Sequence, residues 1–148
     1  MRERSAGFIL FRRKNGKTKF LLIHSSEHSY WSFPKGVIDE GENEIKTALR
    51  ELKEETGITN VRIIEGFKTI NRYFYTRQGE RISKTVSYFL AETVTDKVTL
   101  SYEHDNYTWA EPETALQMLP YPSLKRVLKE AVDFLQNLQN EKNGEKKK

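Results

Sequence analysis

Three glutamates stand close together at a spacing that could bind a metal ion. Glu51, Glu54 and Glu55 occupy positions i, i+3 and i+4, so on a helix their carboxylates share one face. Three like charges this close repel one another and weaken an isolated helix. A hard divalent cation held by oxygen ligands reverses that cost, and Mg²⁺ typically takes a few carboxylates and leaves room for water and phosphate oxygens. The same spacing also occurs on ordinary charged helix faces in solvent.

The helix that carries these glutamates is predicted over residues 43–56, and Gly57 follows it as a C-terminal stop. An apolar stripe beside the carboxylates must face the core, and it consists of Ile45, Ala48, Leu49 and Leu52. The preceding segment, residues 30–41, contains Pro34, Gly36 and Gly41 and is predicted to be a loop. This loop brings backbone groups near Gly36 to the same end of the helix.

The remaining elements supply strands and two further helices. Asn-Gly at 15–16 and Gln-Gly at 78–79 separate apolar or alternating runs, which is typical of hairpins. The predicted strands cover residues 5–13, 19–24, 61–77, 81–92 and 106–110, and the predicted helices cover residues 112–119 and 123–138. Because strands and helices intermix along the chain, we expect an α/β or α+β fold built in layers.

Length and composition exclude several classes of protein. A chain of 148 residues with 11% aromatic residues favours one folded domain, predicted over residues 1–140, with a charged and disordered tail at 141–148. The absence of cysteine excludes disulfides, thiolate catalysis and cysteine-based zinc sites. No apolar run approaches the length of a membrane span and no secretory signal opens the sequence, so we expect a soluble, cytoplasmic protein with no membrane partner.

The net charge of +4 comes from 25 Lys and Arg against 21 Asp and Glu. Half of that excess lies in the tail, which carries four Lys and two Glu. The remainder is too small for a dedicated nucleic-acid surface, and no stable nucleic-acid partner is expected. This small positive charge is compatible with a protein that binds phosphate groups at one local site.

The glutamates belong to a longer pattern that covers residues 36–58. The pattern is Gly, five residues, Glu, seven residues, then Arg-Glu-aliphatic-X-Glu-Glu-X-Gly-aliphatic. Every position is met, by Gly36, Glu42, Arg50, Glu51, Leu52, Glu54, Glu55, Gly57 and Ile58. The segment resembles the signature of the Nudix hydrolases, complete and without a departure.

This resemblance implies an α/β/α sandwich with a mixed sheet, and hydrolysis of a nucleoside diphosphate linked to another moiety. It also implies that Glu51, Glu54 and Glu55 hold Mg²⁺ or Mn²⁺, with the Gly36 carbonyl as a further ligand. The metal would neutralise the pyrophosphate and activate the attacking water, and either Glu54 or Glu51 would lie close to that water. Arg50 is expected to orient a helix glutamate through an ion pair, and Glu42 is expected to support the loop and the helix start.

Outside this segment, the sequence also resembles one subfamily of the Nudix hydrolases, the asymmetric diadenosine tetraphosphate (Ap4A) hydrolases. This similarity covers about residues 4–135. The matching stretches are AGFILFRR at 6–13, WSFPKG at 31–36, IEGF at 64–67, KTVSY at 84–88 and LSYEH at 100–104. Tyr75 stands seventeen residues past Ile58, where a tyrosine is a mark of that subfamily. The resemblance implies that Tyr75 stacks on adenine and that Glu103 approaches the metal.

Further candidate contacts with the substrate are Lys35, Tyr73, Lys84, Arg81 and His104. Each of these residues, and Tyr75 as well, also has an ordinary structural interpretation, such as packing within a strand for Tyr75 or exposure to solvent for the basic residues.

The predicted substrate is Ap4A, cut to ATP and AMP by a monomer or homodimer. Other Nudix activities stay open, on 5′-triphosphate RNA, damaged nucleoside triphosphates or diphosphoinositol phosphates. Lys35 counts mildly against the RNA enzymes, which usually have Gln there, and the intact glutamates count against a non-catalytic binding module.

Overall fold

The computed structural model describes residues 1–146 and contains an eight-stranded sheet with three helices. The strands are β1 (Arg2–Lys14), β2 (Lys17–Ser25), β3 (Trp31–Ser32), β4 (Lys35–Val37), β5 (Arg62–Ile63), β6 (Thr69–Arg77), β7 (Glu80–Glu92) and β8 (His104–Ala110). The helices are α1 (Glu44–Thr56), α2 (Pro112–Met118) and α3 (Pro122–Lys146).

The sheet is mixed, and β1 lies at its centre. β1 pairs with β7 in parallel over ten residues, and with β2 and β4 antiparallel. β6 and β7 form a long antiparallel hairpin, and β8 pairs with β2. The parallel pairing of β1 with β7 brings the N-terminal residues beside a hairpin more than eighty positions away in the sequence.

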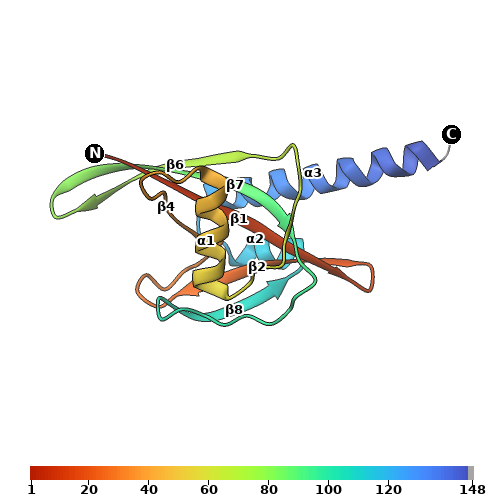
Figure 1. The fold of residues 1–148 in the computed structure, drawn as a ribbon, viewed down its shortest axis with the longest axis horizontal. Coiled ribbons are helices and arrows are strands. Elements are labelled where there is room, and N and C mark those ends of the chain that lie inside the picture. Colours follow the sequence, from red (N-terminus) through yellow and green to blue (C-terminus); the bar gives the residue numbers. More distant parts are fainter. Residues whose placement is uncertain (147–148) are drawn as a thin grey trace.

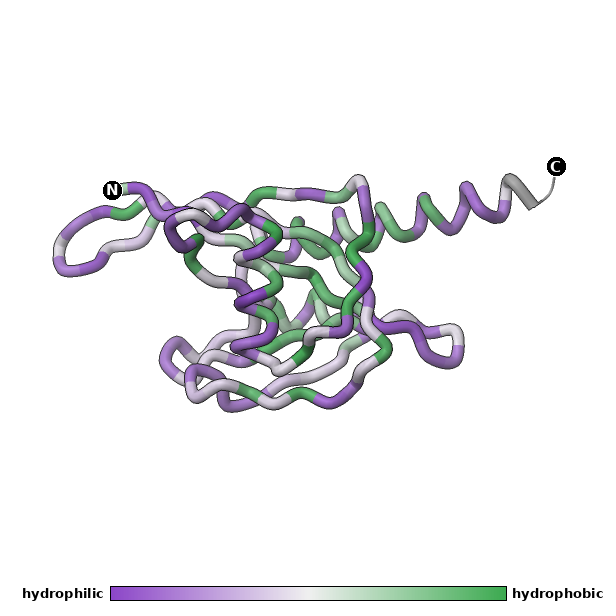
Figure 2. Tube along the Cα trace, in the orientation of Figure 1, coloured by the Kyte–Doolittle hydropathy of each residue, from purple (hydrophilic) through white to green (hydrophobic). Residues whose placement is uncertain are grey.

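Two hydrophobic clusters cover the two faces of the sheet. Alternate residues of β1 point to opposite faces, so Phe8 and Leu10 pack with Leu52 of α1, whereas Ile9 and Phe11 pack with the side of α2 and α3. Figure 1 shows α1 on one side of the sheet and α2 and α3 on the other, and the central strands are the most hydrophobic (Figure 2). The predicted α/β/α sandwich with a mixed sheet is therefore confirmed.

Most predicted elements occur, with three differences. The predicted loop 30–41 contains two short strands, β3 and β4, which add to β2 and β1. The predicted strand 61–77 is interrupted between β5 and β6, where Gly66 has φ of +91°. A side chain with a Cβ is disfavoured in that conformation, so the chain turns there.

The third difference concerns the C-terminal segment that was predicted to be a disordered tail. Helix α3 continues through residues 141–146, and residues 147–148 lie outside the described part of the chain. The end of α3 extends past the sheet on the side opposite to the β6–β7 hairpin (Figure 1). Glu141 and Lys142 in this stretch are exposed, and straight charged side chains such as theirs have good helix propensity.

Within residues 1–146, no helix is both long enough and apolar enough to cross a membrane.

Candidate active site

Helix α1 begins and ends as its sequence predicts. The side chain of Asn43 accepts a hydrogen bond from the backbone N–H of Lys46 at 2.9 Å and so caps the first turn. Gly57 ends the helix with φ of +74°, and its N–H donates to the carbonyl of Lys53. Both ends are thus fixed locally, which sets the direction in which the glutamates of this helix point.

The loop and the helix touch most closely at Gly36 and Glu51. A Cβ added to Gly36 would lie only 1.9–2.4 Å from the carboxylate atoms of Glu51. No residue with a side chain fits there unless Glu51 moves. A side chain at position 36 would therefore displace the carboxylate of Glu51. The contact also places the backbone of β4 against the face of α1 that carries Glu51, Glu54 and Glu55, which we call the acidic face.

Arg50 holds much of the acidic face together. Its guanidinium binds Glu42 through two hydrogen bonds, Nε to Oε2 at 2.7 Å and Nη2 to Oε1 at 3.0 Å, in a bidentate geometry. Its Nη1 contacts Glu51 at 2.9 Å and Glu54 at 3.3 Å, and Asp39 lies 3.3 Å from Nη2. The hydrogen bonds from Arg50 lower the pKa of Glu42 to about 2. One guanidinium therefore organises four carboxylates.

Glu55 is the most buried of the three glutamates, and its side chain is 8% exposed. Its carboxylate accepts from the backbone N–H of Lys35 at 3.1 Å and lies 3.4 Å from Nε2 of His104. Burial, with the charge of Glu51 beside it, raises the pKa of Glu55 to about 8. Burial also raises the pKa of Glu51, despite the opposing effect of Arg50.

The acidic face suits a divalent cation, although no three acidic or histidine side chains within residues 1–146 already converge as a ligand set. Glu54 is turned toward Arg50, and Glu55 toward Lys35 and His104. Burial raises the pKa of Glu51 and of Glu55, and a cation bound at this face would favour their charged forms. An oxygen donor set of crowded carboxylates next to a close backbone approach is what a hard cation such as Mg²⁺ prefers.

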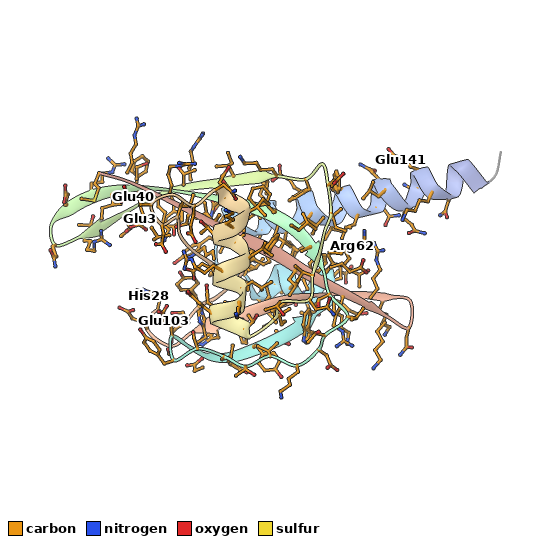
Figure 3. All side chains as sticks on the ribbon, in the orientation of Figure 1. Glu3, His28, Glu40, Arg62, Glu103 and Glu141 are labelled. Carbon is orange, nitrogen blue, oxygen red and sulfur yellow. The ribbon has the colours of Figure 1, made fainter. Side chains whose placement is uncertain are left out.

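A pocket of about 410 Å³ opens beside this acidic face. Glu55, Lys35, Glu103 and His104 line it, together with His28. His28 and Glu103 lie near one end of α1 in Figure 3. The structure therefore brings the predicted residues Glu103 and His104 to the pocket that contains Glu55.

A second cavity of about 760 Å³ adjoins the pocket, and the two share His28, Tyr30, Ser32 and Lys35 in their walls. We call this second cavity the tyrosine cleft, after the five tyrosines in its wall, Tyr30, Tyr73, Tyr75, Tyr88 and Tyr121. Burial and the nearby positive charge of Lys84 lower the pKa of Lys35 to about 8. A basic side chain thus stands where the two cavities join.

Glu3 of β1 connects Tyr75, which lines the tyrosine cleft, with two basic side chains of the β6–β7 hairpin. It accepts a hydrogen bond from the hydroxyl of Tyr75 at 2.9 Å and forms an ion pair with Lys84 at 3.0 Å. Arg77 lies 3.7 Å from the same carboxylate. Burial alone would raise the pKa of Glu3, but the hydrogen bonds from Lys84 and Tyr75 outweigh it and lower the pKa. Glu3 is also labelled in Figure 3.

Arg81 is the predicted contact that the structure does not bring to this region. It pairs with Thr76, one residue beyond Tyr75, so its side chain points to the opposite face of the hairpin. There its guanidinium lies 4.1 Å from the ring centroid of Phe74. Alternation along β7 turns Arg81 away from the tyrosine cleft, and its assignment to the substrate stays a prediction that the strand geometry does not support.

Sequence reasoning missed Glu3, Tyr30 and Tyr121. No local pattern marks them, since each reaches the site through pairing or packing between distant segments. Lys84, in contrast, was predicted, and its pairing partners explain its position. It stands opposite Tyr73 on one side and Glu3 on the other.

Comparisons with known proteins agree with this geometry. The family model described as NUDIX domain matches residues 1–132. The chain is 40% identical over 144 residues to the mouse (Mus musculus) bis(5′-nucleosyl)-tetraphosphatase (asymmetrical), an alignment that covers 89% of this chain and 95% of that protein. It is 36% identical over 134 residues to the protein of the same name from Caenorhabditis elegans, with 89% and 96% covered.

A solved structure, the binary complex of a C. elegans Ap4A hydrolase, superimposes with a TM-score of 0.82 at 36% sequence identity. The match covers 91% of this chain and 98% of that chain. The signature on α1, the sandwich architecture and these full-length similarities all agree, and the chain belongs to the Nudix family.

Proposed function

We propose that this protein is a divalent-metal-dependent hydrolase that cleaves Ap4A asymmetrically into ATP and AMP. The observation that carries the proposal is that the two cavities adjoin at Lys35, with Glu55 of α1 in the wall of one and the tyrosines in the wall of the other. One end suits a metal and a phosphate, and the other suits a nucleobase. The similarity to relatives named asymmetrical tetraphosphatases, over nearly their full length, supports the same substrate.

The acidic face supplies the metal-binding end of this proposal. Nudix hydrolases generally use divalent metal ions, and Glu51, Glu54 and Glu55, with the Gly36 carbonyl, would hold the ion here. When bound, such an ion polarises phosphoryl oxygens and lowers the pKa of a coordinated water. The ion is Mg²⁺ or Mn²⁺ in this proposal, because both accept carboxylate, carbonyl and phosphate oxygens as ligands.

The chain's own side chains then act on the polyphosphate. The ammonium of Lys35, at the junction of the cavities, is placed to bind a phosphate next to the scissile bond. Arg50 keeps Glu51 and Glu54 oriented and limits their mutual repulsion. Glu103 and His104 line the same pocket and would contact the metal or the phosphates.

The aromatic end suits an adenosine. Base stacking on an aromatic ring contributes roughly 1–3 kcal/mol in proteins that bind single strands. Tyr75 and Tyr73, with ring centroids 6.4 Å apart, stand on the wall of the tyrosine cleft. Lys84, which Glu3 holds near Tyr73, would add attraction for a phosphate.

Product analysis tests the proposal directly. Incubation with Ap4A and Mg²⁺ should release equal amounts of AMP and ATP, and hydrolysis in ¹⁸O-water should label only one of the two products. The Glu54→Gln variant serves as the matched control for contaminating phosphatases and should be almost inactive. Formation of two ADP molecules would contradict asymmetric cleavage.

A comparison of rates decides between this substrate and other Nudix substrates. We expect the highest kcat/KM for dinucleoside polyphosphates, above those for nucleoside triphosphates, diphosphoinositol phosphates and 5′-triphosphate RNA. The tyrosine cleft is the reason, because a substrate with a second nucleoside can occupy both cavities. A higher kcat/KM for the RNA would overturn the substrate assignment while leaving the metal site intact. The cytoplasmic location stays a prediction.

A further inference from the structure

Four arginines share one face of the sheet where β1 runs beside the β6–β7 hairpin. Paired residues of neighbouring strands point to the same face, and so do alternate residues of one strand. Thr85 of β7 pairs with Arg4 of β1 on one side and with Arg72 of β6 on the other. Arg2 stands two residues from Arg4, and Arg81 stands four residues from Thr85, so both point to this face as well. We call the surface formed by Arg2, Arg4, Arg72 and Arg81 the arginine face.

The arginine face lies on the opposite side of the sheet from the tyrosine cleft. Tyr73 and Tyr75, which line the cleft, alternate along β6 with Arg72 and Phe74. Helix α1 packs on the same side of the sheet as the arginines, but the β6–β7 hairpin extends past it (Figure 1). All four arginines are exposed. A ligand can therefore reach this surface without entering the cleft.

The charges of the arginine face have no carboxylate partner within residues 1–146. Other basic side chains make the ion pairs of this part of the molecule. Lys68 binds Glu44 at 2.8 Å, whereas Lys84 and Arg77 contact Glu3 on the other side of the sheet. Like charges on one small surface repel one another, and a bound polyanion would remove that repulsion. The small net charge of the chain averages over all surfaces, so it does not reveal this local excess.

The arginine face also carries an exposed aromatic ring and two hydroxyls. The residue Phe74 is 61% exposed, and the guanidinium of Arg81 lies 4.1 Å from the centroid of its ring. A guanidinium held flat in this way offers its outer side to a base and its N–H groups to a phosphate. Ser83 and Thr85 stand between the residues of β1 and β6, where their hydroxyls can donate to phosphate oxygens.

This combination favours a single-stranded nucleic acid over other polyanions. Insertion of Phe74 into a membrane would take the guanidinium of Arg81 with it, and a charge inside a bilayer is costly. An acidic peptide could neutralise the arginines, but it has no flat ring to place on the Arg81–Phe74 pair. A single strand brings both groups that this surface complements, since its phosphates are regularly spaced and its bases are open to stacking.

We propose that the arginine face binds single-stranded nucleic acid without sequence preference. The arginines contact its phosphates, and one base stacks on the Arg81–Phe74 pair. Because the face and the tyrosine cleft lie on opposite sides of the sheet, a bound strand leaves the cleft open to a nucleotide. The inference goes beyond the proposed function and does not depend on it.

Fluorescence anisotropy with the full chain tests the inference. The probes are labelled oligouridylate and oligothymidylate of about twelve nucleotides, with a 5′-hydroxyl so that no terminal phosphate is offered to the metal site. The logarithm of the association constant should fall against the logarithm of salt concentration with a slope of about −3, since four contacts contribute about −0.7 each. Binding of either probe supports the inference, and the tighter one identifies the preferred strand.

The variant Arg4→Gln/Arg72→Gln removes two of the expected contacts. Its salt slope should fall to about −1.4, and its affinity at 0.1 M salt should fall about 20-fold. The matched control is Arg13→Gln/Lys14→Gln, which removes the same charge at the β1–β2 turn, on the far side of the molecule from the β6–β7 hairpin (Figure 1). The control should bind as wild type does, and both variants should keep kcat/KM for Ap4A.

Two further variants test the stacked base and the separation from the cleft. Phe74→Leu should weaken oligouridylate about fivefold, the lower end of the range for one stacked base, and leave an abasic strand of equal length unchanged. Tyr75→Ala, in the tyrosine cleft, should bind both probes as wild type does. Loss of probe binding in Tyr75→Ala would place the strand in the cleft and overturn the inference.

Other results would also contradict it. These are equal losses in the two charge-matched double variants, no binding of either probe at low salt, or tighter binding of polyglutamate or of phosphatidylserine vesicles than of the probes. Polyglutamate or the vesicles would then identify an acidic peptide or a membrane as the occupant. Failure to release AMP and ATP from Ap4A would instead contradict the proposed function and leave this binding test unaffected.

Discussion

The two ends of the proposed substrate cleft are organised around single charged side chains of opposite sign. At the metal end, the cation Arg50 contacts Asp39, Glu42, Glu51 and Glu54. At the aromatic end, the anion Glu3 contacts Lys84, Arg77 and the hydroxyl of Tyr75.

The difference lies in which charge is left in excess. Around Arg50 four carboxylates meet one guanidinium, so negative charge remains to attract a divalent cation. Around Glu3 two cationic side chains meet one carboxylate, so positive charge remains to attract phosphate. In both clusters the central ion reduces repulsion among like charges and orients them, because each partner must point at it. The excess negative charge at the Arg50 cluster then favours binding of a divalent cation, and the excess positive charge at the Glu3 cluster favours binding of a phosphate.

The largest effect is expected when the metal end loses one carboxylate. Glu54→Gln keeps the shape of the side chain and removes its charge, so turnover should fall at least a hundredfold with little loss of stability. Steady-state kinetics at saturating Mg²⁺ measures this. Glu44→Gln, on the same helix but outside the signature, should leave kcat unchanged. Full activity of Glu54→Gln would remove Glu54 from the site.

Replacement of the central cation should have the next largest effect. Arg50→Lys keeps the charge but loses the planar, bidentate contact with Glu42 and the simultaneous reach to Glu51 and Glu54. Loss of a residue that orients metal ligands typically costs about 10- to 100-fold in metal affinity or activity. Titration of Mg²⁺ in the activity assay should show a weaker apparent affinity. An unchanged Mg²⁺ dependence would limit Arg50 to a role in stability.

At the aromatic end, Tyr75→Ala should lower kcat/KM for Ap4A about five- to a hundredfold, mainly through KM. The sequence alone predicts that Tyr75→Phe retains most activity, because stacking needs only the ring. The hydrogen bond to Glu3 changes that expectation to a loss of a few-fold, and Glu3→Gln should match it. If Tyr75→Ala leaves KM unchanged while the protein stays folded, Tyr75 only packs against its neighbours.

The smallest effect is expected in the stability of the folded protein at acid pH, and it tests the charge of Glu42, which is a partner of Arg50. The pKa of Glu42 is lowered from 4.5 to about 2, so its contribution to folding is present above about pH 4.5 and is lost as the pH falls toward 2. Urea unfolding of wild type and Glu42→Gln between pH 6 and pH 3 should show midpoints that converge as the pH falls. Midpoints that stay equally separated at every pH would contradict the role of the Glu42 charge.

Much of the metal end could be predicted because its residues are close together in the sequence. Periodicity placed Glu51, Glu54 and Glu55 on one helix face, and Asn43 and Gly57 marked the ends of that helix. These are local properties, set by a helical repeat of 3.6 residues and by capping. The aromatic end was predicted less completely, since Tyr75 and Lys84 were named but Glu3 was not.

The amino-acid sequence by itself thus determined the family, the layered fold and the acidic face of α1, because a short motif and local periodicity encode them. The tertiary structure decided which residues complete the cleft. Parallel pairing of β1 with β7 brought Glu3 to Lys84, and strand alternation turned Arg81 away. It also left Oδ1 of Asn71 and the hydroxyl of Tyr88 buried without a hydrogen-bond partner. Such outcomes depend on strand register and packing between segments far apart in the chain, and no local pattern specifies register.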